Sequence, residues 1–309
     1  MGKIGPSILV VGSSNTDMVV KTAHLPGPGQ TVLGGTFFMN PGGKGANQAV
    51  AAARLGGNVT FIARLGNDIF GSQAVAQLEK EGIDCRHIRI DPAANTGVAL
   101  ITVDQQGENS IAVAPGANAL LSAEDILAAQ AALDQADIIL VQLEIPLETV
   151  SCLTHLAAGR NKKLILNPAP ARDLPNSLLK QLAIITPNET EAELLTGVPV
   201  RDPATALQAA KILGERGVPI VIITLGSNGA LVWDGKTSAH LQPPPAKAVD
   251  TTAAGDIFNG ALAVAIGEQM NLLEAVAFAN RAAALSVTRL GAQSSAPHRS
   301  EFSGVQFRP

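Results

Sequence analysis

Residues 138–166, with the sequence IILVQLEIPLETVSCLTHLAAGRNKKLIL, decide the fold class of this chain. Residues 138–143 and 163–166 are short and nearly all apolar, and residues 147–158 between them have a helical pattern. Short apolar runs of this kind are typical of strands that are buried on both faces of a parallel sheet. The segment therefore predicts a strand, a helix and a second strand of an α/β fold.

The same alternation continues on both sides of this segment. Further buried strands are expected at residues 8–11, 59–63, 183–186 and 220–225, and helices at residues 45–55, 72–80, 123–135, 189–195 and 204–216. The last third differs, because residues 255–266 and 272–287 form two consecutive Ala-rich helical patterns. The whole pattern predicts helices packed against a central, mostly parallel sheet.

Two regions interrupt the alternation with strand pairs. Residues 17–21 and 31–38 are strand-like and are joined by a stretch rich in Pro and Gly, while residues 98–103 and 110–114 flank a turn signal at 104–107. Extra strands without an intervening helix predict a small β flap on the α/β body. We therefore expect one domain over residues 1–309, with segments 16–39 and 96–115 forming a lid.

The composition limits the classes of function. Of the 309 residues, 46% are hydrophobic and 16% charged, which allows a sizeable core and disfavours a disordered chain. The net charge of −4 and the few aromatic residues disfavour nucleic-acid binding. Cys85 and Cys152 cannot form a disulfide framework and favour a reducing compartment. No apolar run has the length of a signal-peptide core or of a membrane span, so we expect a cytoplasmic protein that binds no membrane.

Several common catalytic motifs are missing. The sequence contains neither the P-loop pattern G-x-x-x-x-G-K-[ST] nor the dinucleotide fingerprint G-x-G-x-x-G, which weakens a nicotinamide dehydrogenase hypothesis. The G-x-S-x-G elbow of α/β hydrolases is also missing. The five histidines share no metal-ligand spacing with one another or with the cysteines.

Residues 40–49, NPGGKGANQA, are the first candidate site. Three glycines and Lys44 stand just before a helical pattern, and glycines at a helix entry let backbone N–H groups approach a polar ligand. Lys44 and Asn47 would add side-chain donors. A Gly-rich turn with one solvated lysine is the alternative, but the segment has more glycine than a turn requires.

Residues 249–260, VDTTAAGDIFNG, are the second candidate site. Small residues at 253–255 would leave backbone N–H groups open to an anion at the positive end of a helix, beside the carboxylate of Asp256. A carboxylate next to a phosphate cradle suits removal of a hydroxyl proton during phosphoryl transfer. The structural alternative is that Asp256, or Thr252 one turn earlier, caps the helix.

The third candidate site follows the strand expected at residues 183–186. Residues 185–193, ITPNETEAE, contain Asn188 and Glu191 at the start of a helical pattern. These two side chains could orient the waters of a Mg²⁺ ion, which prefers oxygen ligands and retains several waters. Taken alone, an acidic first helical turn is more often a response to the helix dipole.

Together, residues 42–49, 188–191 and 250–260 resemble the signatures of the ribokinase/pfkB carbohydrate kinase family, and the similarity extends from residue 12 to residue 295. The resemblance implies a three-layer α/β/α fold with a mostly parallel sheet and a small β-sheet lid. It implies transfer of the ATP γ-phosphoryl group to O5 of D-ribose, with Mg²⁺ and K⁺ as cofactors. It also implies a homodimer that forms through the lid.

The resemblance further implies a role for each matching residue. Asp256 would be the base, and the backbone amides of Ala253, Ala254, Gly255 and Asp256 would form an anion hole, although many relatives carry Gly at the position of Ala253. The sugar would contact Asn15, Asp17, Gly43, Lys44, Asn47, Glu144 and Asp256. The nucleotide would contact Asn188, Thr224, Leu225, Gly226, Ser227, Asn228, Gly229 and Asn280. Asn188 and Glu191 would serve Mg²⁺ through water, and K⁺ would lie at Asp250, Thr252, Ser286, Arg289, Gly291 and Ser295.

Other functions remain open at this stage. Asn15 and Asp17 favour ribose over a deoxy sugar, because a buried carboxylate that loses its hydroxyl partner is left unpaired. A deoxyribokinase, a fructokinase or a nucleoside kinase of the same family is the nearest alternative, and for a nucleoside the nearby aromatic pair is Phe37 and Phe38. A sugar-binding regulatory protein on the same fold would not require Asp256 as a base. A turn at residues 224–229 is equally an ordinary hairpin.

Overall fold

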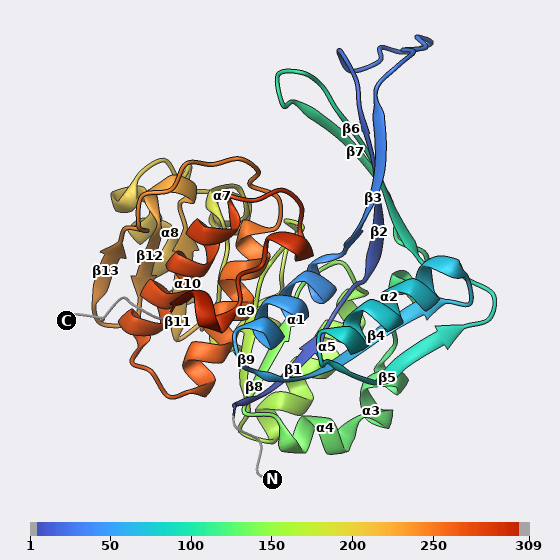
Figure 1. The fold of residues 1–309 in the computed structure, drawn as a ribbon. Coiled ribbons are helices and arrows are strands. Elements are labelled where there is room, and N and C mark those ends of the chain that lie inside the picture. Colours follow the sequence, from blue (N-terminus) through green and yellow to red (C-terminus); the bar gives the residue numbers. More distant parts are fainter. Residues whose placement is uncertain (1–4, 303–309) are drawn as a thin grey trace.

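The computed structural model describes residues 5–302 and is built around one large sheet (Figure 1). Its strand order is β13-β12-β11-β10-β9-β8-β1-β4-β5, and all neighbours are parallel except β11-β12 and β12-β13. The strands are β1 (Ser7–Val11), β4 (Asn58–Gly66), β5 (Asp84–Asp91), β8 (Ile138–Val141), β9 (Lys163–Leu166), β10 (Ile184–Ile185), β11 (Ile220–Thr224), β12 (Ala230–Trp233) and β13 (Ser238–Leu241). The expected mostly parallel sheet is confirmed.

Helices cover both faces of this sheet. The first face carries α1 (Lys44–Arg54), α2 (Ile69–Lys80), α9 (Ala254–Gly267) and α10 (Leu272–Ser286). The second carries α3 (Ala123–Ala128), α4 (Gln130–Gln135), α5 (Leu147–Gly159), α6 (Asn176–Leu179), α7 (Glu189–Thr196) and α8 (Pro203–Glu215). In β1, Ile8 and Val10 pack into the first layer while Leu9 and Val11 pack into the second, as alternation along a strand requires. The three-layer α/β/α architecture is therefore confirmed.

Some elements differ from the sequence-based expectation. The helix expected over residues 123–135 is interrupted at Ala129, which has φ −104° and ψ 24°, so α3 and α4 are separate. Strand β5 was not expected, because this edge strand is rich in charged residues and only partly buried. Four short 3₁₀ helices complete the described chain: η1 (Gly116–Leu120), η2 (Gly226–Asn228), η3 (Gln293–Ser295) and η4 (Arg299–Phe302).

A second, four-stranded sheet forms an arm that projects from the body (Figure 1). Its order is β3-β2-β6-β7, with strands β2 (Asn15–Lys21), β3 (Thr36–Gly42), β6 (Gly97–Val103) and β7 (Asn109–Ala114). The strand expected at residues 31–38 begins only at Thr36, because Gly34 and Gly35 have φ of 92° and 112° and turn the chain before it can pair. This sheet matches the expected small β-sheet lid.

The parallel strands bring several chain segments to one edge of the large sheet. The chain leaves β1 at Val11, β8 at Val141, β9 at Leu166 and β10 at Ile185, and polar residues follow each of these strand ends. Ligands in open α/β sheets bind outside the carboxyl ends of the strands. None of the helices within residues 5–302 combines the length and apolar character needed to cross a membrane.

Candidate active site

Two segments of the site are held together by glycines. Gly43, with φ 88°, packs against the backbone of residues 13–15, and an ideal Cβ on it would be 2.7 Å from Asn15 N. An ideal Cβ on Gly45 would be 2.6 Å from Ser13 N, and one on Gly42 would be 2.3 Å from the Asp17 carboxylate. Backbone atoms exclude a side chain at Gly43 and Gly45, while a side chain at Gly42 would displace the Asp17 carboxylate. The glycines of this motif thus serve close backbone packing, and they place residues 15–17 beside the start of α1.

Lys44 and Glu144 meet at this junction. The Lys44 N–H donates to Glu144 Oε2 at 3.0 Å, and the Ser13 hydroxyl donates a short hydrogen bond to the same oxygen. Glu144 follows β8, Ser13 follows β1 and Lys44 begins α1. Three separate segments are therefore joined by one carboxylate.

Asp256 lies in the first turn of α9, where each oxygen of its carboxylate accepts from one amide side chain. Asn47 Nδ2 donates to Oδ2 at 2.9 Å, and Gln48 Nε2 donates to Oδ1 at 3.0 Å. The alternative that Asp256 or Thr252 caps this helix is wrong, since the N-cap is Ala253 in the left-handed region (φ 60°) with no side-chain cap. Gly255 is exposed, and an ideal Cβ on it would meet no atom within 4 Å, so the chain leaves space beside this helix start.

A chain of buried amides behind Asp256 was missed by sequence reasoning. Gln142 Nε2 donates to Gln48 Oε1 at 2.6 Å, and Gln48 Nε2 also donates to Asn167 Oδ1 at 3.0 Å. All three amides are almost completely buried. Only the positions of these residues in the sequence could have indicated the cluster. Gln142 and Asn167 directly follow β8 and β9, and Gln48 lies within the glycine-rich motif. These contacts fix the Gln48 amide as a donor to Asp256.

The site contains four carboxylates around one lysine, so negative groups outnumber positive ones. Burial, with the carboxylates of Glu144 and Asp256, raises the pKa of Asp17 to about 6 against the opposing effect of Lys44. Burial likewise raises the pKa of Asp256. Burial alone would lower the pKa of Lys44, but the four surrounding carboxylates outweigh it and the pKa is raised. A carboxylate with a raised pKa is suited to accept a proton near neutral pH.

Asn188 and Glu191 form a reciprocal cap at the start of α7. Glu191 N–H donates to Asn188 Oδ1 at 2.8 Å, and the Asn188 backbone N–H donates back to Glu191 Oε2 at 2.9 Å. Burial raises the pKa of Glu191, while the Asn188 N–H and Lys44 lower it, so α7 begins close to the charge of Lys44. No group of three or more His, Cys, Asp or Glu side chains suited to a metal ion occurs within residues 5–302.

Two of the residues implied for the nucleotide, Gly229 and Asn280, lie against one backbone carbonyl. The chain at 224–229 is the turn of the β11–β12 hairpin, so the hairpin alternative is confirmed. At Gly229 (φ 84°), an ideal Cβ would lie 2.0 Å from the Leu241 oxygen. Asn280 Nδ2 on α10 donates to this same oxygen at 3.0 Å. A backbone bridge between Asn188 and Thr224 brings α7 to the other side of the turn.

The residues implied for a monovalent cation lie just before α9 and between the end of α10 and η3. Asp250 accepts from the Thr252 N–H at 2.9 Å and from the Gly291 N–H at 2.8 Å. Arg289 N–H donates to the Ser286 oxygen at 3.0 Å. The Ser295 hydroxyl donates to the Ala292 oxygen at 2.8 Å, within η3. Burial raises the pKa of Asp250, but these hydrogen bonds outweigh it and hold the pKa below its usual value.

Fold and site together define a class of protein. Residues 6–299 match the pfkB family of carbohydrate kinases, and the chain belongs to this family. It is 44% identical to the ribokinase of Haemophilus influenzae over 96% of each chain. It is 38% identical to the deoxyribokinase of Salmonella typhimurium over 96% of this chain and 97% of the relative. It also resembles the structure of Arabidopsis thaliana ribokinase complexed with ribose and ATP, with a TM-score of 0.88 and 34% identity over 96% of this chain and 97% of the other.

Proposed function

We propose that this chain is an ATP-dependent sugar kinase that transfers the γ-phosphoryl group of ATP to O5 of D-ribose, giving D-ribose 5-phosphate. The observation that carries this function is the placement of Asp256. Its carboxylate is fixed by Asn47 and Gln48 at the open start of α9 and lies within electrostatic reach of Lys44. A held carboxylate beside an accessible helix start can take the proton of a sugar hydroxyl while the helix amides bind the transferred phosphoryl group.

The sugar would lie against the polar side chains around Lys44. In support, Asn47 Oδ1 is buried without a hydrogen-bond partner among the described residues, while Nδ2 of the same amide is used by Asp256. A hydroxyl donor of a sugar would satisfy this oxygen. The proposed sugar ligands are Asn15, Asp17, Gly43, Lys44, Asn47, Glu144 and Asp256.

The nucleotide would lie between the start of α7 and the β11–β12 turn. In support, a backbone bridge joins Asn188 to Thr224, and Asn280 donates to the Leu241 oxygen, against which Gly229 packs. The amides of residues 253–256 would hold the transferred phosphoryl group. Mg²⁺, which supplies charge neutralisation at the phosphates, would be held through waters by Asn188 and Glu191.

A K⁺ ion would order the loop that precedes α9 and the segment that follows α10. The residues proposed for it are Asp250, Thr252, Ser286, Arg289, Gly291 and Ser295, several of them through backbone carbonyls. Asp250 already joins the two loops by hydrogen bonds to Thr252 and Gly291. Its lowered pKa keeps this carboxylate ionised and suited to a nearby cation.

The lid would cover the sugar site and join two copies of the chain. Its face opposite to Asp17 exposes Val20, Phe37, Met39 and Leu100, with Phe37 58% and Leu100 57% exposed. An exposed apolar sheet face of this kind is typical of an interaction surface. We propose a cytoplasmic homodimer that forms through this face, and sedimentation velocity tests it, since a monomer at micromolar concentration would contradict it.

The first experiment measures ADP release with ATP and Mg²⁺ for ribose, 2-deoxyribose, fructose and adenosine, in K⁺ and then in Na⁺. We expect ribose to be preferred and the rate to fall in Na⁺. Preference for 2-deoxyribose would instead support the deoxyribokinase alternative, which the 38% identical Salmonella relative keeps open. Sugar binding without any ADP release would favour a regulatory sugar-binding protein.

A further inference from the structure

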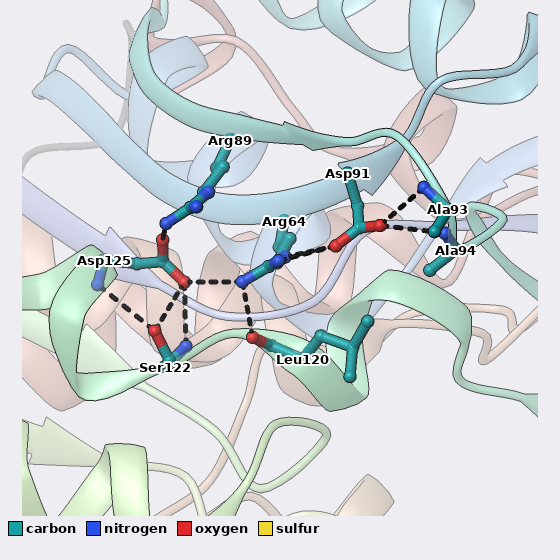
Figure 2. Close-up of polar contacts among 8 residues, drawn as sticks. All are labelled: Arg64, Arg89, Asp91, Ala93, Ala94, Leu120, Ser122 and Asp125. Carbon is teal, nitrogen blue, oxygen red and sulfur yellow. Dashed lines mark hydrogen bonds and ion pairs between the residues drawn. The ribbon is translucent and has the colours of Figure 1, made fainter.

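A compact charged cluster lies outside the proposed sugar and nucleotide sites (Figure 2). Arg64 on β4 donates from Nε and Nη2 to Asp91 Oδ2 at 2.9 and 2.6 Å. Its Nη1 donates to the backbone oxygen of Leu120 at 2.9 Å and lies 3.4 Å from Asp125 Oδ2. Arg89 on β5 donates to the other oxygen of Asp125 at 3.0 Å. We call these four charged residues the Arg64 cluster.

The Arg64 cluster fixes two turns of the chain. Asp91 accepts from the backbone N–H groups of Ala93 and Ala94 at 2.9 and 2.8 Å, which shapes the turn that leads to β6 (Figure 2). On the other side, Arg64 holds Leu120, the last residue of η1, and Asp125 caps α3. With side-chain exposures of only 16% for Arg64 and 4% for Asp125, these contacts are largely shielded from solvent. Helix η1 is therefore held in a set position.

Helix η1 carries Asn118, a residue to which no role has so far been given. Asn118 is 2% exposed and reaches the strand end that bears the proposed sugar ligand Asn15. Its Oδ1 accepts from the Ser14 N–H at 2.9 Å. Its Nδ2 donates to the Ser14 oxygen at 3.2 Å and to Asn15 Oδ1 at 2.7 Å. Every polar atom of this amide is thus used on residues 14 and 15.

These contacts settle which way both amides face. The Ser14 N–H can only donate, so the atom of Asn118 that faces it must be the oxygen. Nδ2 of Asn118 must then face Asn15, so Asn15 has to turn its own oxygen toward Asn118. Asn15 is left with its NH₂ group for a ligand.

The chain packs closely against this pair of amides. Gly97, the first residue of β6, lies against this pair of amides, and an ideal Cβ there would be 2.1 Å from Asn15 Oδ1 and 2.3 Å from Asn118 Nδ2. Any side chain at position 97 would separate the two amides. The turn that brings Gly97 to this place is the one shaped by Asp91.

We propose that Asn118 is a positioning residue that fixes Asn15 as a hydrogen-bond donor toward a sugar hydroxyl, and that the Arg64 cluster holds Asn118 in place. This inference rests on the proposed function, because it concerns the sugar site. Asp17 on the same strand can only accept when ionised. Asn15 as a donor and Asp17 as an acceptor would together satisfy both capacities of sugar hydroxyls.

The test is Asn118→Asp, which keeps an oxygen for the Ser14 N–H and removes the donor to Asn15. We expect Asn15 to rotate, donate to the new carboxylate and present its oxygen to the sugar. The KM for ribose should then rise about 10- to 100-fold, since a buried polar contact becomes unfavourable, while kcat and the KM for ATP change less than about twofold. Ribose affinity measured by calorimetry should fall by the same factor.

Two further variants separate positioning from damage to the fold. Asn95→Asp introduces the same charge at an exposed position near η1 and should leave ribose affinity unchanged. In an Asn15→Ala background, Asn118→Asp should have little further effect on the KM for ribose. Independent, multiplying effects of the two substitutions, or an equal loss of ribose and ATP affinity, would overturn the inference. If the unmodified chain does not bind ribose, it is the proposed function that fails.

Discussion

The Arg64 cluster and the proposed sugar site are two charged clusters that shift the pKa values of their carboxylates in opposite directions. In the Arg64 cluster, the N–H groups of Ala94 and Ala93, together with Arg64, lower the pKa of Asp91 to about 2. In the sugar site, burial and neighbouring carboxylates raise the pKa of Asp17 to about 6. The chain supplies every partner in the first cluster and leaves the second with several carboxylates around one lysine.

This difference separates a structural cluster from a functional one. A carboxylate whose pKa is lowered on folding stabilises the native state above its unfolded pKa, and a carboxylate whose pKa is raised destabilises it there. The ionised Asp91 of the Arg64 cluster therefore stabilises the native state, whereas the ionised Asp17 of the proposed sugar site destabilises it. Carboxylates whose ionised form destabilises the native state are those expected to gain partners when substrate binds.

The largest effect is expected from the sugar site itself. Asp256→Asn removes the proposed base, while the new amide retains one oxygen that can accept from Asn47 or Gln48. The rate of phosphoryl transfer should fall by about 10²- to 10⁴-fold while ribose still binds, as steady-state kinetics and calorimetry can measure. Asp173→Asn, at an exposed position, is the matched control. Turnover close to that of the unmodified chain would remove Asp256 from the catalytic role.

The Arg64 cluster should respond in stability and much less in turnover. Arg64→Met leaves Asp91 and Asp125 without their shared partner, and we expect the Tm at pH 7.5 to fall by roughly 4–8 °C. Arg64 helps to lower the pKa of Asp91 to about 2, so the loss should become smaller as the pH is lowered below about 4, toward 3. Differential scanning calorimetry at the two pH values tests this. An unchanged Tm would show that the cluster contributes nothing to the fold.

The two clusters also differ in how far the sequence predicts them. The glycine-rich motif, Asp256 and Asn188 with Glu191 are contiguous patterns with a chemical meaning, and the alternation of strands and helices predicts the sheet edge where they meet. The bonds from Asn118 to Ser14 and from Arg64 to Asp125 span 104 and 61 positions. No local pattern marks such pairs, because each residue alone has the features of an ordinary turn or surface residue. The residue types alone likewise do not predict the proposed K⁺ ligands, since backbone carbonyls have no side-chain signature.

The smallest effect is expected from Asp17→Asn. Removal of this carboxylate should raise the Tm, whereas removal of Arg64 should lower it. Between pH about 4 and 6 the native state holds a proton on Asp17 that the unfolded chain releases, so the stability of the unmodified chain falls as the pH rises through this range. Asparagine carries no charge, so the variant should have a Tm about 2–4 °C higher at pH 7.5, with about half of that gain at pH 5. The KM for ribose should rise at the same time, because a neutral amide replaces the accepting carboxylate. A lower Tm at pH 7.5 would mean that Asp17, like Asp91, is stabilised by the fold, and the distinction between the two clusters would then be lost.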